Sequence, residues 1–472
     1  MTELIERWQA SPAPAAPAHA SDRGAAPGAI PIDPQHWPDV GAQPAAGLRA
    51  RVAKSLFRRI AGRLDVRVEL AAGLTAPAAV WGAGGADAPV LRLVRPDAFF
   101  ARVGQGGLIG FGESYMAGDW AADDLAGVLT VFAAQMATLV PPRLQRLRDL
   151  YVQRHPSNER CSVDNAQSNI SRHYDLSNEL FELFLDPTMT YSSALFEEVG
   201  GIPLAADELL HEAQERKIDT LLDALGVTTG TDLLEIGTGW GELATRAAGR
   251  GARVHSVTLS EEQQKLAQQR VADAGLSERV SIELCDYRAV AGTYDAVVSV
   301  EMIEAVGYEF WPAYFQTLDR LVRPGGRVGI QAITMPHDRM LASRDTYTWI
   351  HKYIFPGGLL PSVRSVEDDV RAHTQLHVST RRSFGLHYAD TLAIWRERFE
   401  QHADETEALG FDATFRAMWT LYLAYSEAGF RSRYLDVQQF VLQAPPATTR
   451  TCALRAAASS AMSHLTRERS AR

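Results

Sequence analysis

The chain has 472 residues, 46% of them hydrophobic and 22% charged, which is the composition of an ordinary globular protein of about two to four domains. Its formal charge of −10 argues against nucleic-acid binding. The three cysteines, Cys161, Cys285 and Cys452, lie far apart, which argues against both a disulfide framework and a cysteine-based metal site. No apolar run approaches the roughly 20 residues of a membrane span, and no signal-peptide pattern is seen. We therefore expect a cytoplasmic protein without a metal, with peripheral membrane contact left open.

The N-terminal third predicts an arm and a small domain. Residues 1–47 are rich in Ala and Pro and predict a disordered arm, and residues 48–145 predict an α+β domain that contacts lipid or a partner. A stripe at every fourth position predicts a helix over 48–63, and basic residues flank it: Leu48, Val52, Leu56, Ile60 and Leu64, with Arg51, Lys54, Arg58, Arg59 and Arg63. Such a helix either lies on an anionic membrane or docks on its own domain with solvated arginines, and we favour the second interpretation.

Strands and helices alternate over residues 146–443, which predicts a second, α/β domain with a parallel sheet and helices on both faces. The expected strands are 231–236, 253–258, 280–284, 294–300, 327–334 and 437–442. Two helices are expected near 389–403 and 412–429. The Pro- and Gly-rich segment 335–384 interrupts the pattern and predicts a lid insertion, and residues 444–472 predict a flexible tail.

A glycine turn follows the first of these strands. Gly237, Gly239 and Gly241 allow positive φ and close approach of a ligand to the backbone. Glu235 is a carboxylate within an apolar strand, where it needs a partner, and a bound cation is one option. Because ligands bind at the carboxyl ends of such strands, a nucleotide-type site is favoured over a plain turn.

The neighbouring residues narrow the ligand class. Thr258 ends the second strand where a dinucleotide-binding fold places an acid, and the glycine spacing is GxGxG, so a nicotinamide or flavin cofactor is disfavoured. Gln263 is either the partner of Ser260 in a helix-capping box or a ligand contact. Asp286 is equally open between an adenine or ribose contact and a turn residue.

Two further groups of residues are candidates for chemistry. Glu301 and Glu304 follow the fourth strand and would share one side of a helical turn at the ligand-binding edge of the sheet. The polar stretch 168–196 would line the mouth of a cofactor cleft or form a surface cap. It includes His173, Tyr174, Tyr191, Ser192 and Ser193.

Over residues 50–445 the chain resembles the cyclopropane-fatty-acyl-phospholipid synthase family of S-adenosylmethionine-dependent methyltransferases. The most specific matching segments are His173-Tyr-Asp-Leu176 and Tyr353-Ile-Phe-Pro-Gly-Gly358. The others are 186–196, 234–241, 258–263, 286–288, 300–307 and 388–399. The resemblance implies a Rossmann-like methyltransferase sheet. It also implies a set of S-adenosylmethionine contacts: Tyr191, Ser192, Glu235, Gly237, Gly239, Trp240, Gly241, Thr258, Leu259, Ser260, Gln263, Asp286 and Tyr287.

The same resemblance implies a bicarbonate site at Glu304 and Tyr388, with Ser193 and Gln331 beside it as catalytic residues. The chain departs from the family pattern there, because Ser193 replaces the usual cysteine, Gln331 a histidine and Ala305 another histidine. Ser and Gln still donate hydrogen bonds to an anion, so bicarbonate binding is expected in an altered form.

The implied reaction is methylene transfer to the cis double bond of acyl chains in membrane phospholipids, through a carbocation that bicarbonate deprotonates, giving cyclopropane fatty acids. Methyl transfer giving a methylene or methyl-branched chain is the first alternative, and a soluble small-molecule acceptor is the second. A lipid-binding protein without catalysis is a third reading, disfavoured by the intact glycines. Aromatic residues of the insertion would stabilise the cation or simply pack: Tyr347, Trp349, Tyr353 and Phe355. We further expect attachment to the inner face of the membrane and a possible homodimer.

Overall fold

The computed structural model describes residues 30–42, 44–45, 47–70, 79–135, 177–344 and 346–448. Residues 1–29 of the predicted N-terminal arm, most of the predicted tail and the segment His173-Tyr-Asp-Leu176 lie outside the described residues. For residues 30–42 the prediction of a disordered arm is wrong, because Pro38–Gly41 form a helix and Trp37 and Val40 are buried. The chain forms two compact units. Unit 1 combines residues 1–214, 341–358 and 384–436, and unit 2 combines residues 215–340, 359–383 and 437–472.

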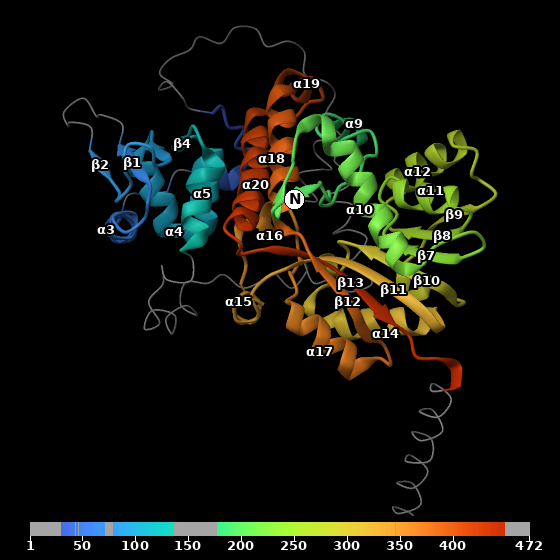
Figure 1. Cartoon of the computed structure of the whole chain (residues 1–472). Coiled ribbons are helices and arrows are strands. Elements are labelled where there is room, and N and C mark those ends of the chain that lie inside the picture. The colour runs from blue at the N-terminus through green and yellow to red at the C-terminus, as the bar shows by residue number, and fades with distance from the viewer. Residues whose placement is uncertain are drawn as a thin grey trace, which may run out of the picture. The chain divides into compact units, whose positions relative to one another are not determined.

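Unit 1 contains a small four-stranded sheet with the strand order β2-β1-β3-β4. The strands are β1 (Arg67–Leu70), β2 (Val80–Trp81), β3 (Val90–Leu93) and β4 (Trp120–Ala122). Helices of the same region are α2 (Pro38–Gly41), α3 (Leu48–Ala61), α4 (Pro96–Met116) and α5 (Leu125–Ala134) (Figure 1). The small α+β fold expected for this region is present.

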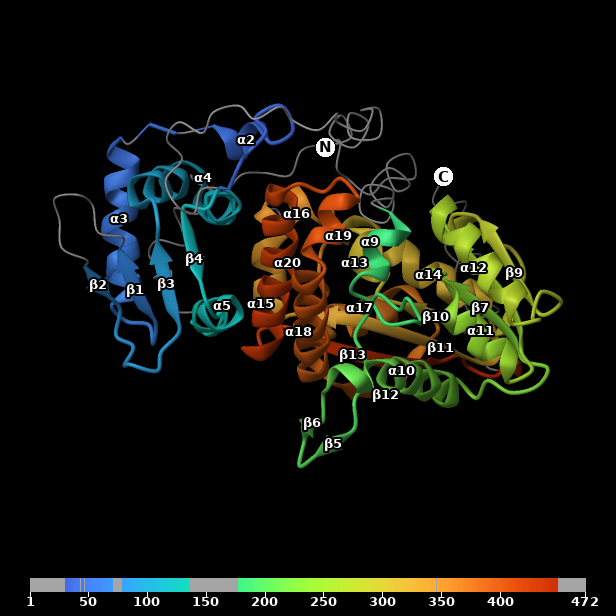
Figure 2. The same cartoon turned by 90° about the horizontal axis from the view of Figure 1, so that it is seen from above.

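The remainder of unit 1 is mainly helical. Its long helices α18 (Gly385–Gln401) and α20 (Ala413–Arg431) pack together. Asp412 caps α20, because its carboxylate accepts a hydrogen bond from the Phe415 amide at 2.7 Å. The shorter elements are α9 (Asn178–Glu182), η3 (Asp207–Leu209), α16 (Trp349–Tyr353) and α19 (Ala403–Ala408). Strands β5 (Glu198–Val199) and β6 (Ile202–Pro203) form a hairpin that projects from its neighbours in Figure 2.

Unit 2 is built on a seven-stranded sheet with the order β12-β13-β11-β10-β7-β8-β9. The central strands pair in parallel, whereas β12 and β13 are antiparallel. The strands are β7 (Asp232–Ile236), β8 (Arg253–Thr258), β9 (Val280–Leu284), β10 (Tyr294–Val300), β11 (Val322–Thr334), β12 (His377–Ser383) and β13 (Asp436–Gln443). The six predicted strands are therefore confirmed, and β12 is an additional edge strand within the segment expected to be an irregular insertion.

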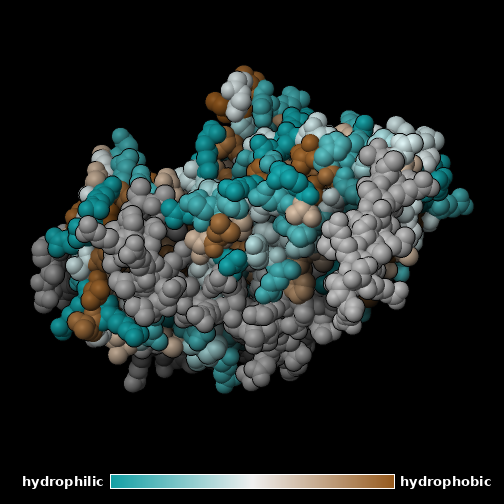
Figure 3. Space-filling view, turned by 90° about the horizontal axis from the view of Figure 1, so that it is seen from below, coloured by the Kyte–Doolittle hydropathy of each residue, from teal (hydrophilic) through white to brown (hydrophobic). Residues whose placement is uncertain are grey.

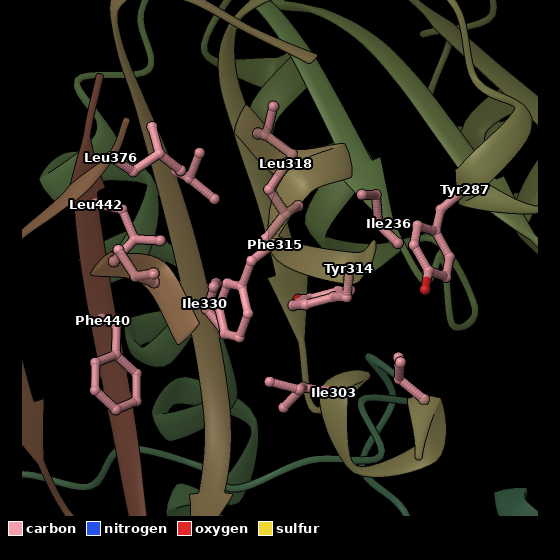
Figure 4. Close-up of a cluster of buried hydrophobic side chains, with 14 of the residues drawn as sticks. Ile236, Tyr287, Ile303, Tyr314, Phe315, Leu318, Ile330, Leu376, Phe440 and Leu442 are labelled. Atoms are coloured by element: carbon pink, nitrogen blue, oxygen red, sulfur yellow. The ribbon is translucent and has the colours of Figure 1, made fainter. Parts of the chain in front are cut away.

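Helices cover both faces of this sheet. Adjacent strand residues point to opposite faces, and Leu233 and Leu234 accordingly belong to two different hydrophobic clusters. One cluster includes residues of α10 (Leu210–Leu225), α11 (Glu242–Gly249) and α12 (Glu261–Asp273). The other, drawn in Figure 4, includes Tyr314, Phe315 and Leu318 of α14 (Trp311–Leu321) and residues of α17 (Val363–His373). The remaining elements are η4 (Tyr287–Ala289), α13 (Ile303–Val306), η5 (Tyr308–Phe310) and α15 (His337–Ser343).

The strand order determines where a ligand binds. The chain passes from β7 outward to β8 and β9 and then returns to β10 on the other side of β7. In a doubly wound sheet, the carboxyl ends of the strands at this reversal open into a crevice for ligands. β7 and β10 are neighbours, so the glycine turn after Ile236 and the segment after Val300 lie at the same edge.

Candidate active site

The glycine turn after β7 has the backbone conformation that its sequence predicts. The φ angles are 93° at Gly237, 52° at Gly239 and 91° at Gly241, and α11 begins directly after the turn. A Cβ atom at Gly237 would lie 2.6 Å from Cγ of Met302, so glycine is needed there for packing. A Cβ at Gly239 would meet nothing within 4 Å. The turn therefore exposes backbone at Gly239, where a ligand can approach closely.

Glu235 lies behind this turn and supports it. The Ser256 hydroxyl donates to Oε2 of Glu235 at 2.5 Å, and the hydroxyls of Ser256 and Thr238 are 2.7 Å apart. Burial raises the pKa of Glu235 to about 8, although the Ser256 hydrogen bond and the charge of Lys217 act to lower it. The partner that this buried carboxyl group requires is thus a hydroxyl, and a protonated Glu235 at neutral pH needs no bound cation.

The end of β8 is organised by hydrogen bonds among three polar side chains. Ser260 caps α12, since its hydroxyl accepts from the backbone amide of Gln263 at 3.2 Å. Oε1 of Gln263 accepts from the Thr258 hydroxyl at 3.0 Å, and the Ser260 amide donates to the same hydroxyl at 3.1 Å. The reciprocal half of the predicted capping box is therefore wrong, because Gln263 turns toward Thr258. Leu259 between them is half-buried.

Asp286 follows β9 and acts as a turn residue. Its carboxylate accepts from the Arg288 amide at 2.9 Å and from the Arg288 guanidinium at 2.8 and 2.5 Å. Tyr287 is buried and makes an edge-to-face contact with Tyr314, with ring centroids 5.7 Å apart. Trp240, in the glycine turn, is also buried.

The segment after β10 differs from its prediction. Glu301 has φ of 50°, a left-handed conformation that is costly for a residue with a side chain, and α13 begins only at Ile303. Glu301 and Glu304 therefore do not share one side of a helical turn. The side-chain amide of Gln331 donates to Oε1 of Glu301 at 2.8 Å. The backbone amide of Ile333 donates to Oε1 of Glu304 at 2.6 Å.

The carboxyl group of Glu304 is in a costly environment for a charge. Other atoms of the residue reach the surface, but Oε2 is buried and has no hydrogen-bond partner among the described residues. Burial is the main cause that raises the pKa of Glu304 to about 8, and the charge of Glu301 adds to it. At neutral pH Glu304 is therefore protonated and can donate a hydrogen bond.

A buried amide pair holds Gln331, and sequence reasoning missed it. Gln331 is fully buried, and its Oε1 accepts from Nε2 of Gln439 at 3.0 Å. Nε2 of Gln439 also donates to the Lys217 carbonyl at 3.3 Å. The chain of contacts from Gln439 through Gln331 fixes the Glu301 carboxylate. The two glutamines lie on the neighbouring strands β11 and β13, and no pattern in the sequence connects them.

The remaining predicted site residues lie in unit 1. The Tyr191 and Tyr422 hydroxyls are 2.7 Å apart, and the Tyr191 ring stacks on Trp395 with centroids 5.3 Å apart. The Ser192 carbonyl accepts from Nε2 of Gln214 at 2.9 Å. Ser193 is fully buried, and its hydroxyl donates to the neighbouring Ala194 carbonyl at 3.0 Å.

Tyr388 and the predicted cation-stabilising aromatics are also in unit 1. Tyr388 is buried on α18 against Trp395 and Phe430. The Tyr353 hydroxyl donates to Oε1 of Glu113 at 2.9 Å, so packing onto α4 accounts for its position. Trp349 likewise packs on α4 and donates to the sulfur of Met116 at 3.4 Å. Phe355 makes an edge contact with Tyr422, with centroids 5.7 Å apart.

The predicted residues of unit 2 converge at one edge of the sheet. The glycine turn, Thr258–Gln263, Asp286-Tyr287, Glu304 and Gln331 all lie at or just after the carboxyl ends of β7 to β11. The exposed backbone at Gly239 fits the approach of S-adenosylmethionine. Among the described residues, no group of His, Cys, Asp or Glu side chains has the arrangement of a metal site. None of their helices is both long and apolar enough to cross a membrane.

Comparisons with known proteins agree with this architecture. The family model described as mycolic acid cyclopropane synthetase matches residues 161–440. The chain is 55% identical to tuberculostearic acid methyltransferase UfaA1 of Mycobacterium tuberculosis, over 88% of this chain and 97% of that protein. It is 34% identical to cyclopropane-fatty-acyl-phospholipid synthase of Escherichia coli (strain K12), over 81% of this chain and 92% of that protein.

Solved structures extend the comparison to the fold. Cyclopropane synthase MmaA2 from Mycobacterium tuberculosis matches with a TM-score of 0.53 and 31% identity, over 59% of this chain and 98% of that one. Mycolic acid cyclopropane synthase CmaA1, complexed with SAH and CTAB, matches with a TM-score of 0.53 and 33% identity over the same shares. The predicted fold class and the predicted use of S-adenosylmethionine are thereby confirmed. The chain belongs to the mycolic acid cyclopropane synthetase family and is an S-adenosylmethionine-dependent methyltransferase.

Proposed function

We propose that this enzyme methylates the cis double bond of an unsaturated acyl chain in a membrane phospholipid, and that its product carries a methylene branch. The observation that carries the proposal is the Glu301 carboxylate, which accepts a hydrogen bond from buried Gln331 and belongs to a residue with backbone φ of 50°. The 55% identity to a protein named as a tuberculostearic acid methyltransferase supports the same outcome.

The reaction requires a dry, preorganised site. S-adenosylmethionine, when bound, supplies an electrophilic methyl group. One alkene carbon bonds to that methyl carbon as the carbon–sulfur bond breaks, and the other alkene carbon becomes cationic. A hydride then shifts from the carbon that bears the new methyl group onto the cationic carbon, which moves the positive charge to the methyl-bearing carbon. Loss of a proton from the methyl group then forms a double bond to that carbon and leaves a methylene group. The contacts proposed for the cofactor are those that the resemblance implies, with Gly239 and Thr258–Gln263 at the sheet edge and Tyr191 and Ser192 in unit 1.

The base that takes the proton distinguishes two versions of the mechanism. Bicarbonate held by Glu304, Tyr388, Ser193 and Gln331 is the version that the resemblance implies. The unit 2 residues fit it poorly. Gln331 already donates to Glu301, and a charged Glu301 next to bicarbonate would oppose anion binding. Protonated Glu304, by contrast, can donate a hydrogen bond to an anion.

We therefore propose Glu301 as the base in place of bicarbonate. A left-handed backbone at a non-glycine residue costs about 1–3 kcal/mol, and such strain persists mainly where function requires it. Gln331 and Gln439 orient the carboxylate, and glutamine cannot take the proton itself. Glu304 then acts as a neutral hydrogen-bond donor beside the reacting atoms.

Cyclopropane formation is the second candidate. It is favoured by 34% identity to a cyclopropane-fatty-acyl-phospholipid synthase over 92% of that protein's length. In that case the first cation loses a methyl proton before any hydride shift, and the methyl carbon closes the ring. Whether the methyl proton leaves before or after the hydride shift decides between the two outcomes.

A lipid acceptor also predicts the location of the protein. We propose that the enzyme attaches peripherally to the inner face of the membrane, where the acyl chains are presented. The homodimer remains a prediction.

Expression of the chain in a bacterial host that lacks this chemistry tests the proposal. Mass spectrometry of the extracted phospholipids is expected to show acyl chains heavier by one CH₂, formed at the expense of monounsaturated chains. Unchanged lipids, together with methylation of a soluble metabolite, would favour the small-molecule alternative and refute the lipid assignment. A Gly239→Ala variant is the matched control, because its Cβ would meet no protein atom within 4 Å and would lie where the cofactor is expected to approach, and its folding is checked by thermal unfolding because φ is 52° there.

A further inference from the structure

Helix α3 docks on unit 1 through one face only. The docked residues are Ala50, Phe57 and Ala61, which are all buried. The Phe57 ring makes an edge-to-face contact with Phe99 of α4 at 5.2 Å. A Cβ at Gly104 of α4 would lie 2.8 Å from the Arg49 carbonyl group, so α3 and α4 approach closely at this point.

The opposite face of α3 is apolar at its centre and open to solvent. Leu48 is 77% exposed, Val52 58% and Leu56 47%. These three residues are four apart, so they form one stripe about 12 Å long. The helix docks on its own domain and its arginines are exposed, as predicted, but the docked face is the one that includes Phe57 and not this stripe. Figure 3 shows brown side chains among teal ones at its left, where Figure 1 draws α3.

The outward face also carries a concentration of positive charge. Arg51 and Arg59 border the stripe, and Arg49 and Arg63 are further exposed cations, whereas Lys54 and Arg58 lie over the rings of Phe100 and Trp81 of the same domain. The helix has no acidic residue. None of these cations forms an ion pair with a carboxylate of the described residues. This excess of positive charge is confined to α3 and its end, because the whole chain has a net charge of −10.

An exposed helix in water normally mixes acids with bases and hides its aliphatic residues. A helix that exposes aliphatic residues between arginines is suited to the boundary between lipid headgroups and acyl chains. The aliphatic side chains there leave water, and the guanidinium groups meet lipid phosphates.

We propose that the outward face of α3, formed by Leu48, Val52, Leu56, Arg51 and Arg59, docks on an anionic phospholipid surface. This inference deepens the proposed function, since it names the surface that would bring the enzyme to its lipid. A second copy of α3 is a poorer occupant, because it would set arginines against arginines. Nucleic acid would engage the arginines but leave the aliphatic stripe in water.

Co-sedimentation of the full chain with vesicles tests the proposal without measuring catalysis. The vesicles are phosphatidylethanolamine with and without phosphatidylglycerol. We expect binding to the anionic vesicles, weakened by salt, and little binding to the neutral ones. A cation at such a surface contributes about 1 kcal/mol, which is roughly fivefold in partitioning. Arg51→Gln with Arg59→Gln is thus expected to reduce partitioning on the order of 25-fold.

Two matched controls separate the surface from general effects. Arg364→Gln with Arg371→Gln removes the same charge from exposed side chains of α17 and is expected to leave vesicle binding unchanged. Val52→Ser with Leu56→Ser should weaken binding, whereas Val199→Ser with Ile202→Ser, on an equally exposed hairpin, should not.

Several results would overturn the proposal. They are equal binding to neutral and anionic vesicles, equal losses in the α3 and α17 arginine variants, and a change of oligomeric state in place of vesicle binding. Failure of lipid methylation with intact vesicle binding would instead count against the proposed function alone. Circular dichroism on each variant confirms that α3, whose altered residues are exposed, remains folded.

Discussion

Glu304→Gln is predicted to make the protein more stable at neutral pH, and product formation is expected to persist, because glutamine is also a neutral hydrogen-bond donor. The pKa of Glu304 is raised from 4.5 to about 8, mainly by burial. Between these values the folded state holds a proton that the unfolded state has released, so the stability of the wild type falls as pH rises. From pH 4.5 to pH 7 this amounts to 2.5 pH units at about 1.4 kcal/mol each, on the order of 3 kcal/mol.

Glutamine removes this dependence because it does not titrate. It also retains an oxygen that can accept from the Ile333 amide, as Oε1 does at 2.6 Å in the wild type. Urea unfolding of both proteins at several values between pH 5 and pH 8 measures the difference in unfolding free energy. We expect the advantage of the variant to grow with pH, and the slope is the quantity to compare, since a fixed cost of burying the amide cancels.

Glu278→Gln is the matched control, because Glu278 is an exposed glutamate of the same unit. Its effect is expected to stay within about 0.5 kcal/mol at every pH. A difference between wild type and Glu304→Gln that does not change with pH would refute the reasoning about the buried carboxyl group. Loss of product formation in Glu304→Gln would contradict the role of Glu304 as a neutral hydrogen-bond donor.

Three further predictions concern the cofactor turn and the base. Ser256→Ala leaves buried Glu235 without its hydroxyl partner, so thermal unfolding is expected to show a loss of about 1–3 kcal/mol, and an unchanged melting temperature would contradict this. Gly237→Ala would place a Cβ 2.6 Å from Met302 at a residue with φ of 93°. Calorimetry should then show S-adenosylmethionine binding weakened at least tenfold, which is roughly 1.4 kcal/mol or more. Equal affinity would argue against this turn as the binding site. Glu301→Gly relieves the backbone strain and removes the carboxylate, so cofactor affinity is expected to persist, product formation to fall at least 100-fold, and added bicarbonate to restore part of it; undiminished activity would exclude Glu301 as the base.

The sheet was predictable from the sequence because its strands have local signatures. Strands such as Asp232–Ile236 and Tyr294–Val300 are compact apolar runs bounded by turn residues. Strand β12 was missed because almost all of its residues are exposed, as is usual for an edge strand, and so no alternating pattern marks it.

Helix α3 shows that the spacing of apolar residues can predict a helix without predicting which of its faces is buried. Leu48, Val52 and Leu56 of the predicted stripe lie on one face of α3, but the helix ends at Ala61 and Leu64 is buried beyond its end. A stripe also does not reveal which side of a helix is covered. Ala50 and Phe57, on the other side, are the buried residues because α4 approaches there. Tertiary packing decided between two faces that are both apolar.

The contacts around the proposed base could not be read from the sequence for a related reason. Gln331 and Gln439 are 108 positions apart and meet only through the pairing of strands in the folded sheet. The left-handed backbone of Glu301 likewise depends on its neighbours in space. Residue types and the ends of the strands were enough to locate the site. Which carboxylate is oriented by hydrogen bonding, Glu301, depends on long-range contacts.

The most direct test of the account determines the structure of the lipid product. Purified enzyme is incubated with S-adenosylmethionine and monounsaturated phospholipid vesicles in buffer depleted of bicarbonate, and the product acyl chains are analysed by proton NMR. The account predicts turnover without bicarbonate and the vinylic signals of a methylene group. High-field cyclopropyl signals, formed only after bicarbonate is added back, would contradict it.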